Sequence, residues 1–437
     1  MTAGGSSTSS YDRRTASSFA AHPPSFVTKV VLAGLIVRMA WILIARVSPV
    51  SDYLWYFDRA AGLAAGSGYI APNGLPTAYF PIGYPAFLAA LFTGFGPSVL
   101  VAQVANAILS TFTIWIVYRL AEQMLATGQA RTVRIARIAA LLFAFSPSQV
   151  LYVALLSDSV LFQFLLCSGT LVLLQARMRW PRLAAGGAIF GLATLTRPYA
   201  MLLPGVVIAA AAISRRPGHR MRRLVIVYSV MAIVLCPWTA RNMRRIGKLV
   251  PVSTNGGVNL LIGNGPGATG GFTEAPLEAL KRADLSEGDA DRRAWILGCH
   301  AILSDPLRFI GLAPRKLLHM FGDDSQALRW NLKGMGSAAR GGRYSPWALA
   351  GMGLVQAYYS LIVLAAIAFL GVGVRRRLLR RKVSILGCLL FVTFAALAVV
   401  FFGEPRFHFP LVPFLCFYAA CSWESARRHS WTGSPAS

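Results

Sequence analysis

Charge, and acidic charge above all, is what this sequence has little of. Charged residues make up 14% of the 437 residues, and 16 Asp and Glu stand against 43 Lys and Arg. A soluble domain has about 25% charged residues, so a soluble globular fold is excluded. The net charge of +27 would suit a nucleic-acid-binding protein. However, the basic residues form short clusters between apolar runs, so no single basic face results.

Cysteine motifs and a signal-peptide cleavage site are missing too. Five of the six cysteines lie in or beside apolar runs, where a free thiol is a small hydrophobe. Cys299 alone lies in a polar segment, and no CxxC or Cys/His spacing indicates zinc. Because no small-x-small site follows Val47, we expect residues 26–47 to be an uncleaved anchor behind a disordered tail, 1–25.

Long apolar runs are what the sequence has in abundance, since hydrophobic residues are 55% of the chain. A helix needs roughly 20 residues to cross a hydrocarbon core of about 30 Å, and in lipid a helix pairs its own backbone polar groups. We therefore predict an all-α, polytopic membrane protein with about ten transmembrane helices. The predicted spans are 26–47, 99–120, 138–156, 159–176, 183–197, 199–214, 224–240, 348–373, 384–403 and 407–421.

The apolar stretch 80–96 is ambiguous, because counting it as a span reverses the orientation of everything after it. If it lies along the interface and the N-terminus is inside, the short outer loops hold only Arg59, Arg197 and Arg406. This asymmetry satisfies the positive-inside rule, so we place 80–96 at the outer interface. The cytoplasmic clusters are then Arg131, Arg134 and Arg137; Arg177, Arg179 and Arg182; Arg215, Arg216, Arg220, Arg222 and Arg223; and Arg375 to Arg377 with Arg380, Arg381 and Lys382.

This topology divides the chain into segments. A membrane core, 26–240, carries a first outer loop at 48–98 with an interfacial helix. An outer segment, 241–346, holds most of the 16 acids, and C-terminal transmembrane helices, 347–421, lead to a cytoplasmic tail, 422–437. We expect a multi-pass protein of the cytoplasmic membrane whose active site faces the periplasm or the exterior.

The first outer loop carries an acid at the start of a short predicted helix. Asp52, Tyr56, Ala60 and Leu63 recur at helical spacing and share one face. Asp58 lies six residues on from Asp52, points elsewhere and is the weaker candidate. Asp52 is interpreted either as a functional carboxylate or as the cap of the helix that begins there.

A second acid stands between two apolar runs, in Ser157-Asp158-Ser159. A carboxylate at a membrane edge is costly to desolvate, and such groups are candidates for function. Asp158 is therefore a candidate second acid or acceptor residue, and a helix cap is again the alternative.

Three arginines lie at the outer ends of spans, against the positive-inside bias: Arg197, Arg241 and Arg406. Any one of them can snorkel to the interface. Three at one level favour a bound phosphate, to which His408 can add a further donor. The supporting positions are Tyr56, Glu404 and Asn242.

At these residues the chain resembles the GT-C superfamily of integral-membrane glycosyltransferases. The likeness is to the bacterial branch related to protein mannosyltransferases and lipid A aminoarabinose transferases. The pieces that carry it are Asp52 to Gly66-Ser67-Gly68-Tyr69; Tyr79-Phe80-Pro81-Ile82-Gly83-Tyr84-Pro85; Ser157-Asp158-Ser159; Leu195-Thr196-Arg197-Pro198; Pro237-Trp238-Thr239-Ala240-Arg241-Asn242; Ser253 to Leu260 with Gly263-Asn264; and Glu404-Pro405-Arg406-Phe407.

The resemblance implies a sugar donor linked to a polyprenyl phosphate and used on the outer face of the membrane. It implies that Asp52 is the catalytic residue and that Asp158 matches a second outer acid, which in relatives helps the acceptor or a metal. Arg406 falls where relatives often have an Arg-Tyr pair near the lipid phosphate, but Phe407 replaces the tyrosine here. No residue is assigned to a metal, and a divalent cation stays open as a cofactor.

The predicted function is transfer of the sugar to an acceptor hydroxyl, with inversion. Asp52 would accept the proton and the arginines would bind the phosphate, so Asp52 and Arg406 are predicted to converge at one cavity on the outer rim. The expected partners are the lipid-linked donor, the bilayer and a glycolipid, glycan or protein acceptor, without nucleic acid.

Three other readings stay open. A lipid-linked sugar flippase or other transporter would need polar groups inside the spans, where Arg38 is the only clear charge, and matching halves, which the sequence lacks. An O-antigen ligase or polymerase would share the long outer segment but would not need Asp52. A non-catalytic scaffold would leave the placement of the outer acids and arginines unexplained.

Overall fold

The computed structural model describes residues 25–125, 130–175, 179–212, 220–281, 285–337, 343–376 and 381–431. Over these residues the protein is built from helices, with one isolated bridge between Ile70 and Pro76. The predicted all-α class is confirmed. The predicted disordered tail, except Ser25, lies outside the described residues, as do residues 432–437. So do Arg177, Arg215, Arg216, Arg377 and Arg380 of the predicted cytoplasmic clusters.

Helices occupy all ten predicted spans. They are α1 (Ser25–Ala45), α4 (Val99–Leu125), α5 (Ala130–Ala144) with α6 (Pro147–Leu151), α7 (Asp158–Leu174), α8 (Trp180–Thr196), α9 (Leu203–Ala212), α10 (Arg220–Ile246), α16 (Pro346–Arg376), α17 (Arg381–Val400) and α18 (Val412–Trp431). Among the described residues, α1, α4, α10 and α16 are each long and apolar enough to cross a membrane, and the number is six if two bent helix pairs count as spans.

The two bent helix pairs lie in different parts of the chain. α5 and α6 meet at 53° where Pro147 begins the second helix, since proline ends the hydrogen-bond ladder of the helix before it. The other pair, α13 (Glu287–Ser304) and α14 (Pro306–Phe321), is bent by 105° and lies in the predicted outer segment.

The ambiguous stretch 80–96 forms α3 (Gly83–Phe95), which packs against α2 (Asp52–Ala64). At 1.5 Å per residue its 13 residues extend about 20 Å, which is short of a hydrocarbon core. α3 is thus one of the shorter apolar helices, and its place at the outer interface stays a prediction. Gly83 brings α3 close to α8, because a side chain there would lie 2.5 Å from Thr196 Oγ1.

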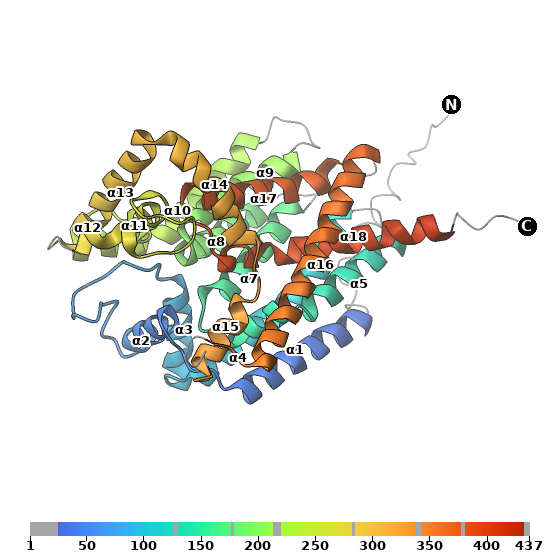
Figure 1. Cartoon of the computed structure of the whole chain (residues 1–437), viewed down its shortest axis with the longest axis horizontal. Coiled ribbons are helices and arrows are strands. Elements are labelled where there is room, and N and C mark those ends of the chain that lie inside the picture. The colour runs from blue at the N-terminus through green and yellow to red at the C-terminus, as the bar shows by residue number, and fades with distance from the viewer. Residues whose placement is uncertain are drawn as a thin grey trace, which may run out of the picture.

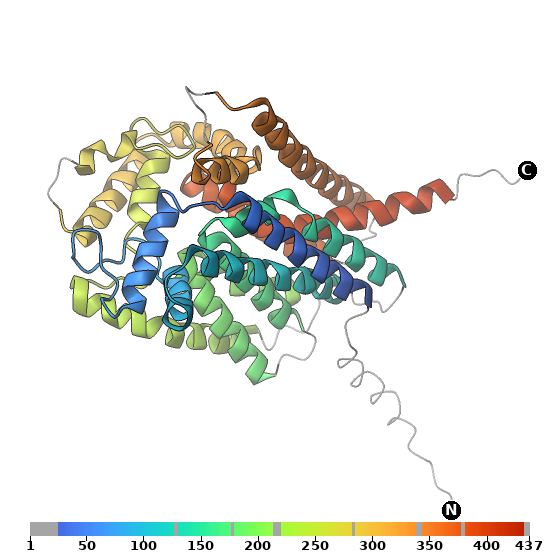
Figure 2. The same cartoon turned by 90° about the horizontal axis from the view of Figure 1, so that it is seen from below.

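The segment after α10 forms α11 (Gly256–Asn264), η5 (Ala275–Leu277), α12 (Glu278–Lys281), α13, α14 and α15 (Gln326–Gly334). A small core of Val258, Leu261, Ile262, Ala294 and Phe402 joins α11 and α13 to the loop after α17. In both views α2 and α11 to α13 lie at one end of the molecule, and the C-terminal part of α18 extends from the other end (Figures 1 and 2).

Arg38 is the one charge expected inside a span, and it is fully buried in α1. Its Nε donates to Ser110 Oγ at 2.8 Å, and its Nη1 donates to the carbonyl oxygens of Gly34 at 3.0 Å and Ala144 at 2.9 Å. These bonds supply the partners that the sequence requires for a mid-span arginine, and they tie α1 to α4 and α5.

Candidate active site

Asp52 is presented by a tight turn. Ser51 adopts φ 54° and ψ −129°, and Val50 O accepts a hydrogen bond from Tyr53 N at 3.1 Å. α2 then begins at Asp52. Its Oδ2 accepts a hydrogen bond from Arg406 Nη1 at 3.1 Å, across 354 positions of sequence. Ser51 therefore occupies the N-cap position, and the Asp52 carboxylate is directed at an arginine.

Arg406 lies in the short turn η6 (Pro405–Phe407) between two acids. Its Nε lies 2.7 Å from Glu404 Oε2, while Glu404 Oε1 accepts from Gln326 Nε2 of α15 at 3.1 Å. The side chains of Arg406 and Asp52 remain 23% and 34% exposed. The pair is thus held by α2, η6 and α15 and is still open to a ligand.

Asp158 makes a bidentate ion pair with Arg197. Arg197 Nε and Nη2 donate to the two carboxylate oxygens at 2.8 Å each, Nη2 also donates to Ser159 Oγ, and Nη1 donates to Tyr199 OH at 3.1 Å. Ser157 is the N-cap of α7, since its Oγ accepts from Ser159 N. The Asp158 carboxylate is therefore not a cap, and Arg197 is committed to holding it.

The charge state of Asp158 follows from these contacts. Asp158 precedes the predicted span 159–176. Burial there disfavours the ionised form. The charge and hydrogen bonds of Arg197, with the charge of Arg406 and a hydrogen bond from Ser157, together outweigh burial and hold the pKa of Asp158 below its usual value. The carboxylate is thus ionised at neutral pH.

The two ion pairs belong to one group, which we call the acid–arginine cluster: Asp52, Asp158, Arg197, Glu404 and Arg406. The charge of Arg406 acts on Asp158, and the charges of Asp158, Arg406 and Asp52 all act on the buried Tyr56. Three carboxylates and two guanidiniums leave the cluster with an excess of negative charge. In the described part of the chain, no three His, Cys, Asp or Glu side chains gather as metal ligands.

Arg241 and Asn242 lie in a different set of contacts. Arg241 Nη1 donates to Thr77 O at 2.7 Å, its Nη2 donates to Tyr69 O, and its guanidinium stacks 4.9 Å from the Trp238 ring. Asn242 Nδ2 donates to Val250 O at 3.0 Å. Arg241 thus holds the first outer loop against α10, while Asn242 holds the chain that follows α10. Neither residue has a hydrogen bond to a member of the cluster among these contacts.

His408 is fully buried behind Arg406. Its Nε2 lies 3.0 Å from Asp324 Oδ1, its Nδ1 contacts Met320 O, and its ring stacks on Tyr359 with centroids 4.6 Å apart. Both ring nitrogens face oxygen atoms of the protein, so neither is directed at a ligand. Asp58 is exposed on α2, away from the Asp52 face, as its spacing predicted.

Sequence reasoning missed Gln326, Tyr199 and Asp324, which orient Glu404, Arg197 and His408 respectively. The only signal for the first of them is Asp323-Asp324-Ser325, a polar run of the type that precedes a helix. Nothing in the local pattern indicates which distant residue each one contacts.

One part of the chain matches a known protein family. Residues 80–240 match the family model for dolichyl-phosphate-mannose-protein mannosyltransferase. This matched segment includes Asp158 and Arg197 but neither Asp52 nor Arg406. No curated protein sequence matches the chain.

The fold is shared with solved membrane proteins. The apo oligosaccharyltransferase of Archaeoglobus fulgidus superposes with a TM-score of 0.55 and 14% identity, over 93% of this chain and 51% of that one. The same organism's oligosaccharyltransferase AglB, in complex with an inhibitory peptide and a dolichol-phosphate, gives 0.53 and 13%, over 94% and 52%. The transferase ArnT of Cupriavidus metallidurans, bound to undecaprenyl phosphate, gives 0.46 and 14%, over 91% and 78%.

The chain therefore spans about half the length of the oligosaccharyltransferases that it matches. The predicted resemblance is confirmed at this level: residues 80–240 match the mannosyltransferase family model, and the chain has the fold of the Archaeoglobus fulgidus oligosaccharyltransferase.

Proposed function

We propose that this protein transfers a sugar from a polyprenyl-phosphate donor to an acceptor hydroxyl at the outer face of the cytoplasmic membrane. The observation that carries the proposal is the contact of Asp52 with Arg406, at 3.1 Å and 354 residues apart. The fold and the family match of residues 80–240 support a glycosyltransferase. A carboxylate and a cation at one partly exposed place are what such a reaction requires of the protein.

Arg406 binds the donor phosphate. Its Nε edge is held by Glu404, so the edge that carries Nη1 is the one available to a ligand. The donor phosphate competes with Asp52 for this edge, since a guanidinium binds a phosphate in the same two-point geometry as a carboxylate. Donor binding therefore releases Asp52 from its ion pair.

Asp52 then acts as the base. The acceptor oxygen bonds to C1 of the sugar, the bond from C1 to the phosphate oxygen breaks, and the acceptor proton passes to Asp52. Attack opposite the phosphate inverts the anomeric centre. The lipid phosphate leaves as a stable anion, so a cation suffices and no acid is needed on that side.

Asp158 serves the acceptor side of this reaction. Arg197 holds it ionised and in one orientation through two hydrogen bonds. A fixed carboxylate next to Tyr56 accepts hydrogen bonds from the acceptor and so positions its hydroxyl for attack.

The test uses membranes that contain the protein and a panel of radiolabelled polyprenyl-phosphate sugars. We expect one donor to be consumed and its label to appear on an acceptor. Asp52→Asn should fold and bind donor but lose transfer by about a hundredfold or more, because a positioned base typically contributes 10²–10⁴-fold.

Asp58→Asn is the matched control, because Asp58 is an exposed acid of the same helix, and it should keep full activity. Near-normal transfer by Asp52→Asn removes Asp52 from the mechanism. Movement of label across the membrane without transfer overturns the proposed activity.

A further inference from the structure

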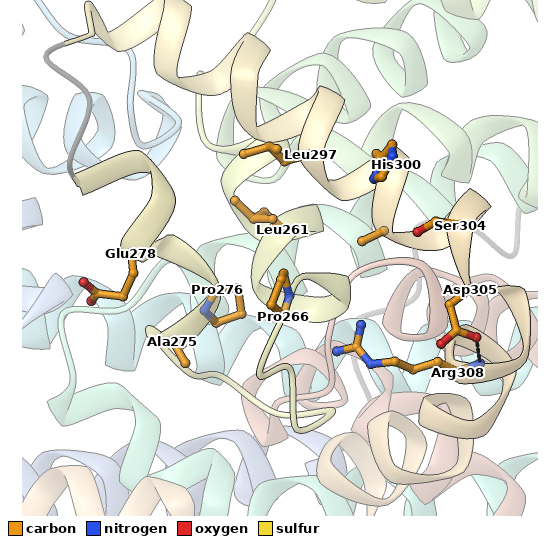
Figure 3. Close-up of a pocket in the computed structure, with 11 residues that line it drawn as sticks. Leu261, Pro266, Ala275, Pro276, Glu278, Leu297, His300, Ser304, Asp305 and Arg308 are labelled. Atoms are coloured by element: carbon orange, nitrogen blue, oxygen red, sulfur yellow. Dashed lines mark hydrogen bonds between the residues drawn. The ribbon is translucent and has the colours of Figure 1, made fainter.

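A cavity of about 410 Å³ lies in the predicted outer segment, apart from the residues of the acid–arginine cluster. It is formed by the C-terminal end of α11, by η5, by α13 and by the start of α14 (Figure 3). Its volume falls within the range of small-molecule sites, which is about 300–1,000 Å³. No step of the proposed reaction uses it.

The walls of the cavity combine apolar and charged side chains. Leu261 and Pro276 supply aliphatic surface, while Glu278, His300, Asp305 and Arg308 supply polar groups. In Figure 3 the guanidinium of Arg308 points towards the α11 side, across from α13. An apolar surface faced by a few polar groups is the usual composition of a ligand site.

Two of these polar groups are held in place by the backbone. Arg308 Nη1 and Nη2 donate to the carbonyl oxygens of Asn264 at 3.0 Å and Gly265 at 2.7 Å, at the end of α11 where a cation is favoured. Asp305 is the N-cap of α14 and accepts from Arg308 N at 2.9 Å through one carboxylate oxygen. These side chains are therefore ordered before any ligand arrives.

The cavity wall carries both negatively and positively charged side chains, and this combination indicates the class of ligand. An anion would meet the carboxylate of Asp305, and a cation would meet Arg308. A neutral ligand rich in hydroxyl groups can donate to this carboxylate and accept from the guanidinium, while its ring lies on Leu261 and Pro276. We propose that this cavity binds a neutral saccharide.

Packed side chains connect the wall of the cavity to the loop that carries Arg406. Leu261 lines the cavity and also packs in the core that includes Phe402, against which Phe407 lies. Phe407 is the residue after Arg406. On the proposed transferase function, the bound saccharide is then a sugar unit of the acceptor, held at a distance from the hydroxyl that reacts.

The direct test measures binding without the reaction. Full-length protein in lipid nanodiscs, free of sugar-headed detergent, is titrated with methyl α-mannopyranoside and methyl α-glucopyranoside by saturation-transfer NMR. Ser304→Trp places a large ring in the cavity wall. Leu303→Trp adds the same ring to the preceding residue of α13, which is 78% exposed and is not part of the cavity wall.

We expect a saturation-transfer signal from wild type and Leu303→Trp, and at least a tenfold weaker affinity in Ser304→Trp. His300→Ala repeats the test if Ser304→Trp unfolds. No signal in wild type, equal signals in both tryptophan variants, or displacement of the glycoside by millimolar inorganic phosphate each overturn the proposal.

The link to transfer is tested separately. Ser304→Trp should raise KM for the acceptor at least fivefold and leave kcat and donor affinity unchanged. Glycoside binding should persist in Asp52→Asn. If transfer fails in every assay while glycosides still bind, the transferase function is wrong and the saccharide site stands. If glycoside binding is lost in Ser304→Trp and the acceptor KM is unchanged, the saccharide is not part of the acceptor.

Discussion

At the scale of single residues, the backbone conformation of Ser51 sets the direction of Asp52, the proposed base. Its φ of 54° with ψ of −129° lies in a region that glycine adopts readily and serine does not. Such a conformation costs about 1–3 kcal/mol and persists only where neighbouring structure enforces it. Here Tyr53 and Trp330 pack edge to face, with ring centroids 5.4 Å apart, and hold the first turn of α2.

Ser51→Gly should relieve this strain. We expect stability to rise by about 1 kcal/mol, because relief of strain exceeds the entropic cost of an added glycine. Transfer should fall severalfold, since Asp52 is less restrained. Thermal unfolding and the transfer assay measure the two effects. Ser67→Gly, at a position without positive φ, should not be stabilised, and a loss of stability in Ser51→Gly would contradict the strain argument.

The Asp158–Arg197 pair stabilises the fold, unlike the strained turn at Ser51. Its contribution to stability depends on both partners being present. The two side chains are only 15% and 6% exposed. Asp158→Asn leaves the guanidinium without its counter-charge, which costs about 3–5 kcal/mol when a buried pair is broken. We expect a large drop in Tm for this variant and almost none for the exposed Asp58→Asn.

The pH dependence of this stability follows from the pKa of Asp158. Because the folded pKa lies below the ordinary 3.8, the unfolded chain binds the proton first as pH falls. The stability from this pair is complete above pH 3.8 and is lost as pH falls through the lower folded value. The Tm difference between wild type and Asp158→Asn should thus be constant from pH 5 to 8 and shrink below pH 4. A difference that shrinks near pH 6 would contradict this.

At the scale of elements, side chains of α13 and α10 hold the first outer loop in place. Glu287 of α13 accepts from Ala78 N at 2.8 Å and from Thr254 Oγ1 at 2.6 Å, and it contacts Thr77 Oγ1. Arg241 of α10 binds the carbonyl oxygen of Thr77 from the other side. The loop between α2 and α3 is thus fixed by two charged side chains from distant parts of the chain.

Because Arg241 is used to hold the loop, we expect only Arg406 to bind the donor phosphate. Arg406→Ala should weaken binding of polyprenyl phosphate about tenfold to a hundredfold, as expected for loss of a hydrogen bond to a charged group. Arg241→Ala should lower stability and transfer but leave this affinity unchanged. Titration of each purified variant with polyprenyl phosphate measures the difference. Equal weakening in both would restore the sequence-based role of Arg241.

The loop that carries Glu404 and Arg406 is anchored by the outer segment. Lys316 of α14 is fully buried, and its Nζ donates to Asn264 Oδ1 and to Val399 O at 2.7 Å each. Gly403 packs so closely on α14 that a side chain there would lie 1.8 Å from Lys316 O. α11, α14 and the end of α17 therefore meet directly before the proposed active site.

Charged side chains lie at both ends of the molecule as a whole. Asp52 and Arg406 of the acid–arginine cluster pair at the start of α2, whereas Arg134 of α5 pairs with Glu424 of α18 at 2.6 Å. In Figure 1 α2 and the end of α18 lie at opposite ends of the molecule. The orientation that follows from the arginine clusters stays a prediction. It does not depend on the exact length of any one span.

Cysteine labelling tests this orientation. Cys299 and Cys236 are both exposed, but Cys236 lies in the predicted span 224–240 and would face lipid. In variants that keep one of these cysteines, a membrane-impermeant maleimide added to intact cells, with the outer face accessible, should label Cys299 and not Cys236. Ser425→Cys, at the other end, should react only after the membrane is opened. Labelling of Cys299 only after opening would reverse the topology.

The sequence by itself determined the helical class and the position of the helices, because lipid leaves an apolar run no other way to pair its backbone. The place of α3 at the outer interface, which rests on charge asymmetry, stays a prediction. Hydropathy and charge are local properties, so they can be read from neighbouring residues. Asp52 and Arg406 were expected to converge at one cavity on the outer rim. The two side chains do meet, at 3.1 Å, while the cavity around them stays a prediction.

Only the tertiary structure decided which partner each polar side chain takes. Arg197, Arg241 and Arg406 look alike in the sequence, as basic residues at helix ends. In the folded protein Arg197 holds Asp158, Arg241 holds backbone carbonyls, and Arg406 alone lies between Asp52 and Glu404. These roles differ because the partner of a side chain depends on which distant helix ends pack together, and no local pattern encodes that packing.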